Sequence, residues 1–269
     1  MAVTISGGVF DFTATGYEAP TWSGGVYSFG LDAPTDVYQL SPDLNDNGYL
    51  YAATNLGLFI IDIETELEFA RAENNYCTSV WNSNDKIFMG TTNSGIYALD
   101  KSTISSGVIT NSLYQYRAYP NITDNDVKYL HGQSDYLCAT TAAGVDFIWI
   151  SINDWDSRTI ADAYKCFVCS DGKTYFTTSG TPNKIYRSNV PLGVSSTPVE
   201  YTCGSGYLEN VPNVQDIYVT ERTSSVETVL WPENTLFIAA SGSAFIFDEG
   251  SKELADYRIR GPTSCQLKW

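Results

Sequence analysis

One short pattern recurs along the whole chain and constrains the fold more than any other feature of the sequence. Each copy has a strand-like run of large and small residues, a turn that contains Gly, and a second apolar run. The clearest copies are LYAATNLGLFIID (50–62), FMGTTNSGIYALD (88–100) and LCATTAAGVDFIWI (137–150), with Gly57, Gly95 and Gly144 at the same place in the turn. β-Branched and aromatic runs on either side of such a turn predict β-hairpins.

Further strands are expected around each hairpin. Two looser copies of the hairpin begin at Thr174 and Leu236. A short alternating run precedes each hairpin, and a fourth run often follows it, as in ELEFARA (66–72). That last segment is the strongest helix candidate in the chain, but its Glu residues alternate with Leu67 and Phe69, which is the period of a strand. We therefore expect an all-β fold of units with four antiparallel strands.

The two ends of the chain read as parts of one further unit. SCQLKW (264–269) has the pattern of a first strand, and AVTISGGVFDFT (2–13) has the pattern of the hairpin that should follow it. Six units then average about 45 residues, with equivalent positions at Ile5, Ala53, Thr91, Thr140, Thr178 and Ala240. We expect one domain over residues 1–269, closed by pairing between the two ends through Val3, Ile5, Cys265, Leu267 and Trp269.

Four-stranded antiparallel units at this spacing resemble the β-propeller superfamily, over essentially the whole chain. The resemblance implies a six-bladed β-propeller whose closing blade is shared by the N- and C-termini. It does not extend to a subfamily, because the GH and WD dipeptides of WD40 blades and a kelch double glycine in every unit are missing from the sequence. The segment 170–175 approaches a sialidase-type Asp-box with one residue too few, and we interpret it as an Asp-Gly turn.

Charge and hydropathy exclude two classes of partner. The chain has 15 Lys and Arg against 31 Asp and Glu, a net charge of −16, which repels the phosphates of nucleic acids. No window reaches 18 apolar residues, and the first residues lack the pattern of a signal peptide. We therefore expect no nucleic-acid binding and no membrane insertion.

The sequence contains no recognisable catalytic constellation. His131 is the only histidine, and it precedes Gly132 at the end of an expected strand, so we interpret it as a turn histidine rather than a general base. The seven arginines do not share one repeat position. Paired carboxylates for glycoside hydrolysis remain an alternative, because sequence spacing does not report their separation. We expect a protein without enzymatic activity.

Two short patterns in the sequence resemble parts of metal sites. Cys166 and Cys169 form a CxxC pattern, but on a strand their side chains face opposite ways, so we expect buried thiols rather than a zinc site. Asp43, Asn45 and Asn47 match the opening of a calcium loop, yet Thr54 stands where the bidentate carboxylate belongs. We favour a polar turn there and no cofactor, with Ca²⁺ as the alternative.

Two long excursions are the candidate interface. Residues 101–125 and 188–213 interrupt the repeat and combine Tyr with Ser, Gly and Asn, the composition of adaptable contact surfaces. Their candidate contact residues for a protein or a glycan are Tyr114, Tyr116, Tyr119, Tyr201, Tyr207 and Leu208. Solvated connectors with strand-buried tyrosines are the alternative interpretation.

The overall composition resembles that of virion proteins from tailed bacteriophages, with abundant Ser, Thr, Asn, Gly and Tyr and few Lys and Arg. This resemblance implies a non-catalytic structural component of a tail, neck or attachment apparatus, located in the virion or in the cytoplasm before assembly, with other proteins as partners. A glycan-binding propeller lectin is the alternative, although the six Trp do not fall at one repeat position. A glycoside hydrolase is the third and weakest candidate.

Overall fold

The computed structural model describes residues 34, 36–43, 45, 48–65, 67–73, 76–104, 107–189, 197–208, 211, 213–219, 235–240, 243–251 and 253–257. The chain divides into two compact units, which we call the N-terminal unit (1–91 and 97–115) and the C-terminal unit (92–96 and 116–269). Each unit is described by itself. Within the described part of the chain, no helix is long and apolar enough to cross a membrane.

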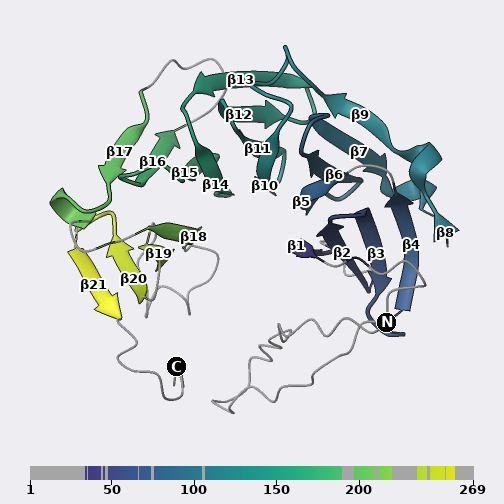
Figure 1. Ribbon diagram of the computed structural model, residues 1–269, viewed down its shortest axis with the longest axis horizontal. Coiled ribbons are helices and arrows are strands. Elements are labelled where there is room, and N and C mark those ends of the chain that lie inside the picture. Colours follow the sequence, from purple (N-terminus) through teal and green to yellow (C-terminus); the bar gives the residue numbers. More distant parts are fainter. Residues whose placement is uncertain are drawn as a thin grey trace. The chain divides into compact units, whose positions relative to one another are not determined.

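The strands of the N-terminal unit form two sheets (Figure 1). The first has the order β1-β2-β3-β4-β8, and its strands are β1 (Val37–Pro42), β2 (Tyr49–Thr54), β3 (Gly57–Asp62), β4 (Leu67–Glu73) and β8 (Gly107–Val108). The short β8 runs parallel to β4, and the other neighbours are antiparallel. The second sheet has the order β5-β6-β7-β9, with strands β5 (Cys77–Asn82), β6 (Lys86–Thr91), β7 (Ile96–Asp100) and β9 (Tyr114–Arg117). The first residue of β7 and the last two residues of β9 belong to the C-terminal unit.

Three antiparallel sheets of four strands make up the described part of the C-terminal unit. The first contains β10 (Val127–Gln133), β11 (Tyr136–Thr141), β12 (Gly144–Trp149) and β13 (Asp154–Thr159). The second contains β14 (Ala163–Val168), β15 (Lys173–Thr178), β16 (Lys184–Asn189) and β17 (Val199–Thr202). The third contains β18 (Val214–Val219), β19 (Thr235–Ala240), β20 (Ser243–Asp248) and β21 (Glu253–Tyr257). Within each sheet the strands follow chain order.

A β-bulge recurs in the first strand of each of these five sheets. The register shifts directly after the first residue of the strand, which is Val37, Cys77, Val127, Ala163 or Val214. These residues pair with Thr54, Thr91, Thr141, Thr178 and Ala240. The repeat is therefore confirmed in these sheets, but the equivalent positions at Ala53 and Thr140 were wrong by one residue, because the alignment by turn residues overlooked turns of different length.

The repeated Thr and Gly close the hairpins. Thr54 Oγ1 donates to the Gly57 carbonyl at 2.8 Å, and Thr141 Oγ1 donates to the Gly144 carbonyl at 3.2 Å. Gly95 has a φ of 79°, the left-handed region that favours Gly. The predicted hairpins are therefore confirmed at β2–β3, β6–β7 and β11–β12, and the 66–72 segment is the outer strand β4 rather than a helix.

Apolar side chains fill the space between neighbouring sheets of each unit. In the N-terminal unit, Tyr51 and Ile60 of the first sheet pack with Val80 and Met89 of the second. In the C-terminal unit, the sheet β14–β17 is buried on both faces. Cys166, Val168 and Phe176 join a cluster with Cys138 and Phe147, while Tyr175 and Ile185 join another with Ile238 and Phe247.

Two sequence-based expectations concern the number of blades and their closure. The all-β architecture of four-stranded sheets is confirmed, but the described residues hold five sheets rather than six. The residues expected to close the ring, Val3, Ile5, Cys265, Leu267 and Trp269, lie outside the described residues, so closure and the single domain stay predictions. The second excursion is not a simple loop, since its described part contains β17 and the turn of 3₁₀-helix Gly206–Leu208.

Candidate protein-interaction surface

A buried arginine organises a surface of the C-terminal unit. Arg117, the last residue of β9, has only 7% of its surface exposed. Its Nη2 donates to the main-chain carbonyl of Asn153 at 2.7 Å and to Asn153 Oδ1 at 2.6 Å. Its guanidinium carbon lies 4.6 Å from the centroid of the Trp155 ring and 5.3 Å from that of Tyr116. The side chain thus joins β9 to the turn before β13 and holds two aromatic rings.

Two exposed residues lie close to Asn153 in the sequence, Ile152 in the turn and Trp155 in β13. Ile152 is 58% exposed, Trp155 is 37% exposed, and Asn153 has a φ of 53°, a left-handed conformation that Asn tolerates. We call Tyr116, Arg117, Ile152, Asn153 and Trp155 the Arg117 patch. Trp, Tyr and Arg are the residue types enriched at the energetic centres of protein interfaces. The patch therefore combines two aromatic rings in contact with a buried arginine and an exposed apolar residue of the neighbouring turn.

The tyrosines predicted from the first excursion have different surroundings. Tyr114, in the N-terminal unit, is 38% exposed, and its hydroxyl accepts a hydrogen bond from Lys86 Nζ at 3.0 Å. Tyr119, in the C-terminal unit, is 69% exposed, and its backbone N–H donates to Asn125 Oδ1. Tyr116 is half-buried under Arg117. All three remain candidate contact residues.

The second excursion supplies fewer surface residues than expected. Tyr207 is exposed, but Tyr201 and Leu208 belong to a buried apolar cluster. Tyr201 faces inward because β17 pairs with β16, which places alternate residues of the strand on the core side. As contact residues, Tyr201 and Leu208 are therefore corrected to core residues.

A buried carboxylate explains the polar end of Tyr201. Its hydroxyl donates to Glu249 Oε1 and that of Tyr175 donates to Glu249 Oε2, both at 2.6 Å. Arg187 Nη1 lies 2.7 Å from Oε1. Burial, followed by the hydrogen bond and the charge of Glu249, raises the pKa of both tyrosines. The network ties β15, β16 and β17 to the end of β20, which is a structural role.

His131 is also structural. Its Nδ1 accepts a hydrogen bond from the backbone N–H of Val168 at 3.0 Å, and its ring stacks on Phe167 with centroids 4.4 Å apart. Burial lowers the pKa of His131 to about 4. The imidazole is therefore neutral near pH 7 and holds β14 to β10. The expected turn position is wrong, because His131 lies within β10 and pairs with Cys138 of β11.

Sequence reasoning missed a lysine inside a first strand. Lys165 Nζ lies 3.9 Å from the centroid of the Tyr129 ring. Burial lowers the pKa of Lys165, and the negative charge of Asp216 opposes this shift. The contact with the tyrosine ring also favours the ammonium form. The available signal was a Lys in the otherwise apolar run YKCFVC. The contacts of Lys165 link the first strands of neighbouring sheets and do not form a recognisable reactive centre.

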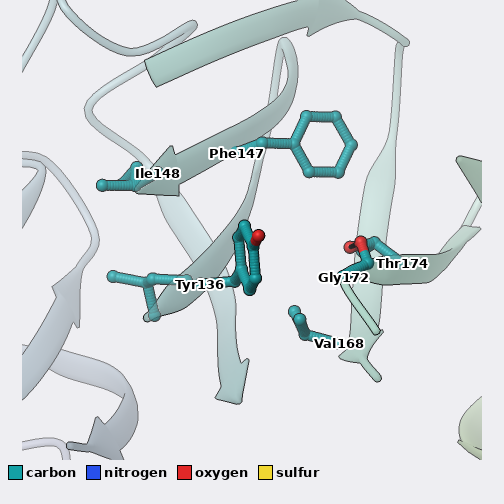
Figure 2. A pocket seen from close by; sticks show the side chains of 7 residues that line it. Tyr136, Phe147, Ile148, Val168, Gly172 and Thr174 are labelled. Atoms are coloured by element: carbon teal, nitrogen blue, oxygen red, sulfur yellow. Dashed lines mark hydrogen bonds between the residues drawn. The ribbon is translucent and has the colours of Figure 1, made fainter. Parts of the chain in front are cut away.

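A small cavity lies between the first two sheets of the C-terminal unit. Figure 2 shows the ring of Tyr136 with Phe147, Val168 and Thr174 around it. The cavity measures about 10 Å³, which is room for one water molecule. Sites for organic ligands are far larger, typically several hundred Å³. This cavity therefore does not suggest a substrate site.

The described residues of the possible calcium loop form hydrogen bonds with other protein groups. Asp43 Oδ1 accepts hydrogen bonds from Lys101 Nζ at 2.5 Å and from the backbone N–H of Asn45. Asn45 Nδ2 donates to the carbonyl of Asn84. Asn47 lies outside the described residues. These contacts are those of a polar turn.

The cysteines of the CxxC pattern point to different clusters. Cys166 packs with Cys138 and Phe147, and Cys169 packs with Tyr175 and Cys203. This is the opposite-facing arrangement expected from a strand. Burial raises the pKa of Cys203 to about 11, which keeps this thiol protonated near pH 7.

Comparison with known proteins gives a fold without a family. No family model matches the sequence, and a search of curated proteins finds no significant match. The structure is similar to the β-propeller domain of Cps50 (Swd1) from Myceliophteria thermophila, with 11% identity over 81% of this chain and 72% of that one and a TM-score of 0.58. It is similar to streptogramin B lyase, with 11% identity over 85% of this chain and 70% of that one and a TM-score of 0.60.

A third solved structure is much longer than this chain. It is the extracellular domain of a putative one-component system, BT4673, from B. thetaiotaomicron, with 12% identity, a TM-score of 0.57 and coverage of 82% of this chain. This chain spans only 28% of its length. At identities this low, structural similarity indicates the fold alone, and that fold is of the β-propeller type.

Proposed function

We propose that this protein is a non-catalytic propeller scaffold that binds a partner protein, and that the partner docks on the Arg117 patch. The observation that carries the proposal is Arg117 itself, which is buried and contacts the ring of the exposed Trp155. A ring held in place before binding loses little conformational entropy when a partner covers it. This is the property of an interface centre rather than of a solvated turn.

Several side chains that could serve catalysis have structural partners instead. His131 accepts a backbone hydrogen bond, and Glu249 accepts from two tyrosines. Asp146 accepts from the backbone and side chain of Thr123 and from Ser157, and burial raises its pKa. These contacts support the non-catalytic part of the proposal. The fold does not decide it, because one similar structure is named as a lyase.

Cross-linking tests the docking site. A photo-reactive phenylalanine analogue at position 152 should cross-link to one protein in an extract of the source cells. Mass spectrometry identifies that partner, which is then purified for binding measurements. Trp155→Ala should weaken binding of that partner at least tenfold, since it removes the central ring. Tyr207→Ala is the matched control, because it removes an exposed tyrosine of the same unit. Equal loss in both variants, or no loss in Trp155→Ala, would contradict the assignment.

We further propose that this protein and its partner belong to a tailed-phage particle, in the tail, neck or attachment apparatus. The support for this proposal is composition: few Lys and Arg with abundant Ser, Thr, Asn, Gly and Tyr. Peptides of this chain should be found in purified particles at a constant ratio to the major tail protein. Their absence would leave a protein-binding scaffold outside the virion.

We also propose that the ring has six blades, closed by residues 2–13 and 264–269. The support is that the first sheet is apolar on both faces. Leu50, Ala52, Phe59 and Ile61 form a buried cluster on the face opposite Tyr51 and Ile60. Among the described hydrophobic residues only Val37 is partly buried against it, and the Arg71 guanidinium carbon lies 5.9 Å from the centroid of the Phe59 ring. A further sheet would cover that face, as in every blade of a closed ring.

Deletion of residues 264–269 tests the closure. It should lower the midpoint of thermal unfolding by several degrees or prevent folding, because it removes one strand of the closing blade. A deletion without effect on the midpoint would contradict the closure and with it the single domain over residues 1–269.

Glycan binding is the competing function, with Tyr207 as its remaining exposed candidate in the second excursion. Saturable binding on a glycan array that is lost in Tyr207→Ala would favour a lectin over the protein scaffold.

A further inference from the structure

Arg117 differs from the other described arginines because it lacks an ion pair with a described carboxylate. Arg71, Arg158 and Arg187 each form an ion pair with a carboxylate, on Glu68, Asp156 and Glu249. Arg117 is more deeply buried than any of these three, yet it forms no ion pair with a described residue. A buried cation without a counter-charge is costly, even where aromatic rings and carbonyl oxygens offset part of the cost.

The guanidinium also keeps unused hydrogen-bonding capacity. Nη2 makes two hydrogen bonds with the oxygens of Asn153, whereas Nε is buried and has no acceptor among the described residues. Arginine carries five N–H donors in a planar fork that matches a carboxylate. The two Asn153 oxygens occupy one side of this fork with neutral acceptors, in a turn whose residues 151–153 are all exposed.

We propose that the Arg117 patch recognises the side-chain carboxylate of an acidic residue on the partner protein. The acid pairs with Arg117, and an apolar neighbour on the partner packs against Ile152 and Trp155. Asn153 gives way in the exposed turn to admit the acid. The inference rests on the proposed protein-binding function and deepens it by naming the chemistry of the partner.

Net charge limits the kind of partner. The chain carries −16, so a uniformly acidic partner would be repelled at long range. A single Asp or Glu within an otherwise uncharged or basic segment satisfies Arg117 without that penalty. We therefore expect one acid per binding segment, next to an apolar residue.

A peptide selection tests the proposal without knowledge of the partner. The full-length protein is used to select from a yeast-displayed library of random peptides. The bound peptides should be enriched in a single Asp or Glu beside an apolar residue. Replacing that acid by its amide should weaken the binding of a selected peptide at least about tenfold, the range for a hydrogen bond to a charged group.

Variants of the protein assign the preference to Arg117. Arg117→Met should abolish the discrimination between acid and amide, and Arg117→Lys should retain part of it, because Lys keeps the charge without the fork. Arg158→Met is the matched control, since Arg158 is already paired with Asp156. Circular dichroism verifies the folding of each variant, and Arg117→Lys serves as the test if Arg117→Met does not fold.

The outcomes separate this inference from the proposed function. Peptides that need Trp155 but bind equally as acid and amide would overturn the carboxylate and leave the docking site. Peptides whose binding is unchanged by Trp155→Ala and by Arg117→Met would contradict both the carboxylate recognition and the docking site. A selection that returns no binding peptide would also contradict both.

Discussion

Three hydrogen-bond donors converge on the carboxylate of Glu249, which is almost fully buried. Tyr175, Tyr201 and Arg187 come from three neighbouring strands, so one side chain fixes the relative positions of β15, β16 and β17. Removal of the acid leaves two buried hydroxyls without their acceptor and a partly buried guanidinium without its counter-charge. Such losses are more costly than the gain from the intact pair.

We expect Glu249→Ala to lower the free energy of unfolding by about 3 kcal/mol, the range for breaking a buried, hydrogen-bonded ion pair. Urea denaturation at pH 7 measures it. Asp171→Asn is the control, because its pairing with Lys173 is far more exposed than Glu249 and should contribute less than about 1 kcal/mol. Equal losses of unfolding free energy in the two variants would contradict a larger contribution of the Glu249 network.

His131 makes stability depend on pH. Burial places the pKa of its imidazole at about 4 in the folded state, below the ordinary value of 6.5. Between these values the unfolded chain binds a proton that the folded chain excludes. The free energy of unfolding therefore falls as pH falls from about 6.5 towards 4.

Between pH 7 and pH 4.5 this contribution should amount to about 2 kcal/mol. His131→Gln removes the titrating group while an amide oxygen remains to accept from Val168. Urea denaturation of both proteins at the two pH values checks it: the natural protein should lose more stability than the variant. The same loss in both would assign the pH dependence to other groups.

At this scale the sequence allowed only part of the candidate surface to be predicted. Tyr119 and Tyr207 are exposed as expected, whereas Tyr201 and Leu208 are buried. The Arg117 patch was not predicted, because Arg117 and Trp155 are 38 positions apart and only the arrangement of β9 and β13 brings them together. Local composition carries no signal of such a contact.

At the level of elements, the β11–β12 hairpin shows why Gly recurs in the turn. A Cβ on Gly144 would lie 2.3 Å from the carbonyl oxygen of Arg158 and 2.8 Å from Thr123 Cγ2. The first neighbour is backbone of the adjacent β13 and cannot move away without disturbing the sheet. Gly144 therefore permits close approach of two strands and of the segment that contains Thr123.

We expect Gly144→Ala to lower the free energy of unfolding by about 2 kcal/mol, as overpacking against backbone does. Gly180→Ala is a suitable comparison, since its Cβ would meet only Asp162 Oδ2 at an ordinary 3.4 Å. That substitution should change stability by less than about 1 kcal/mol. Thermal unfolding of both variants decides between packing and a general effect of Gly loss.

The elements themselves were largely predictable from sequence. Alternation of polar and apolar residues identified β4 as a strand despite its helix-forming residues, and Gly57, Gly95 and Gly144 located three hairpins. The bulges in the first strands were not predicted, because they depend on register with the following strand. The same is true of β17, whose pairing with β16 follows a long connection.

At the scale of the whole molecule, the sequence repeat corresponds to sheets that pack face to face within each unit. Five sheets are described, and the sixth is proposed from the apolar outer face of the first sheet and from the patterns at the two ends of the chain. The proposed interaction surface involves β9 and β13, each of which is an outermost strand of its own sheet.

Hydrogen exchange of the intact protein, followed by mass spectrometry, tests the closed ring most directly. Backbone amides paired within a sheet exchange only when the sheet opens. Peptides covering residues 2–13 and 264–269 should therefore be protected to the same degree as peptides from β2 and β3. Complete exchange of both ends within seconds, with β2 and β3 still protected, would contradict the six-bladed closed propeller.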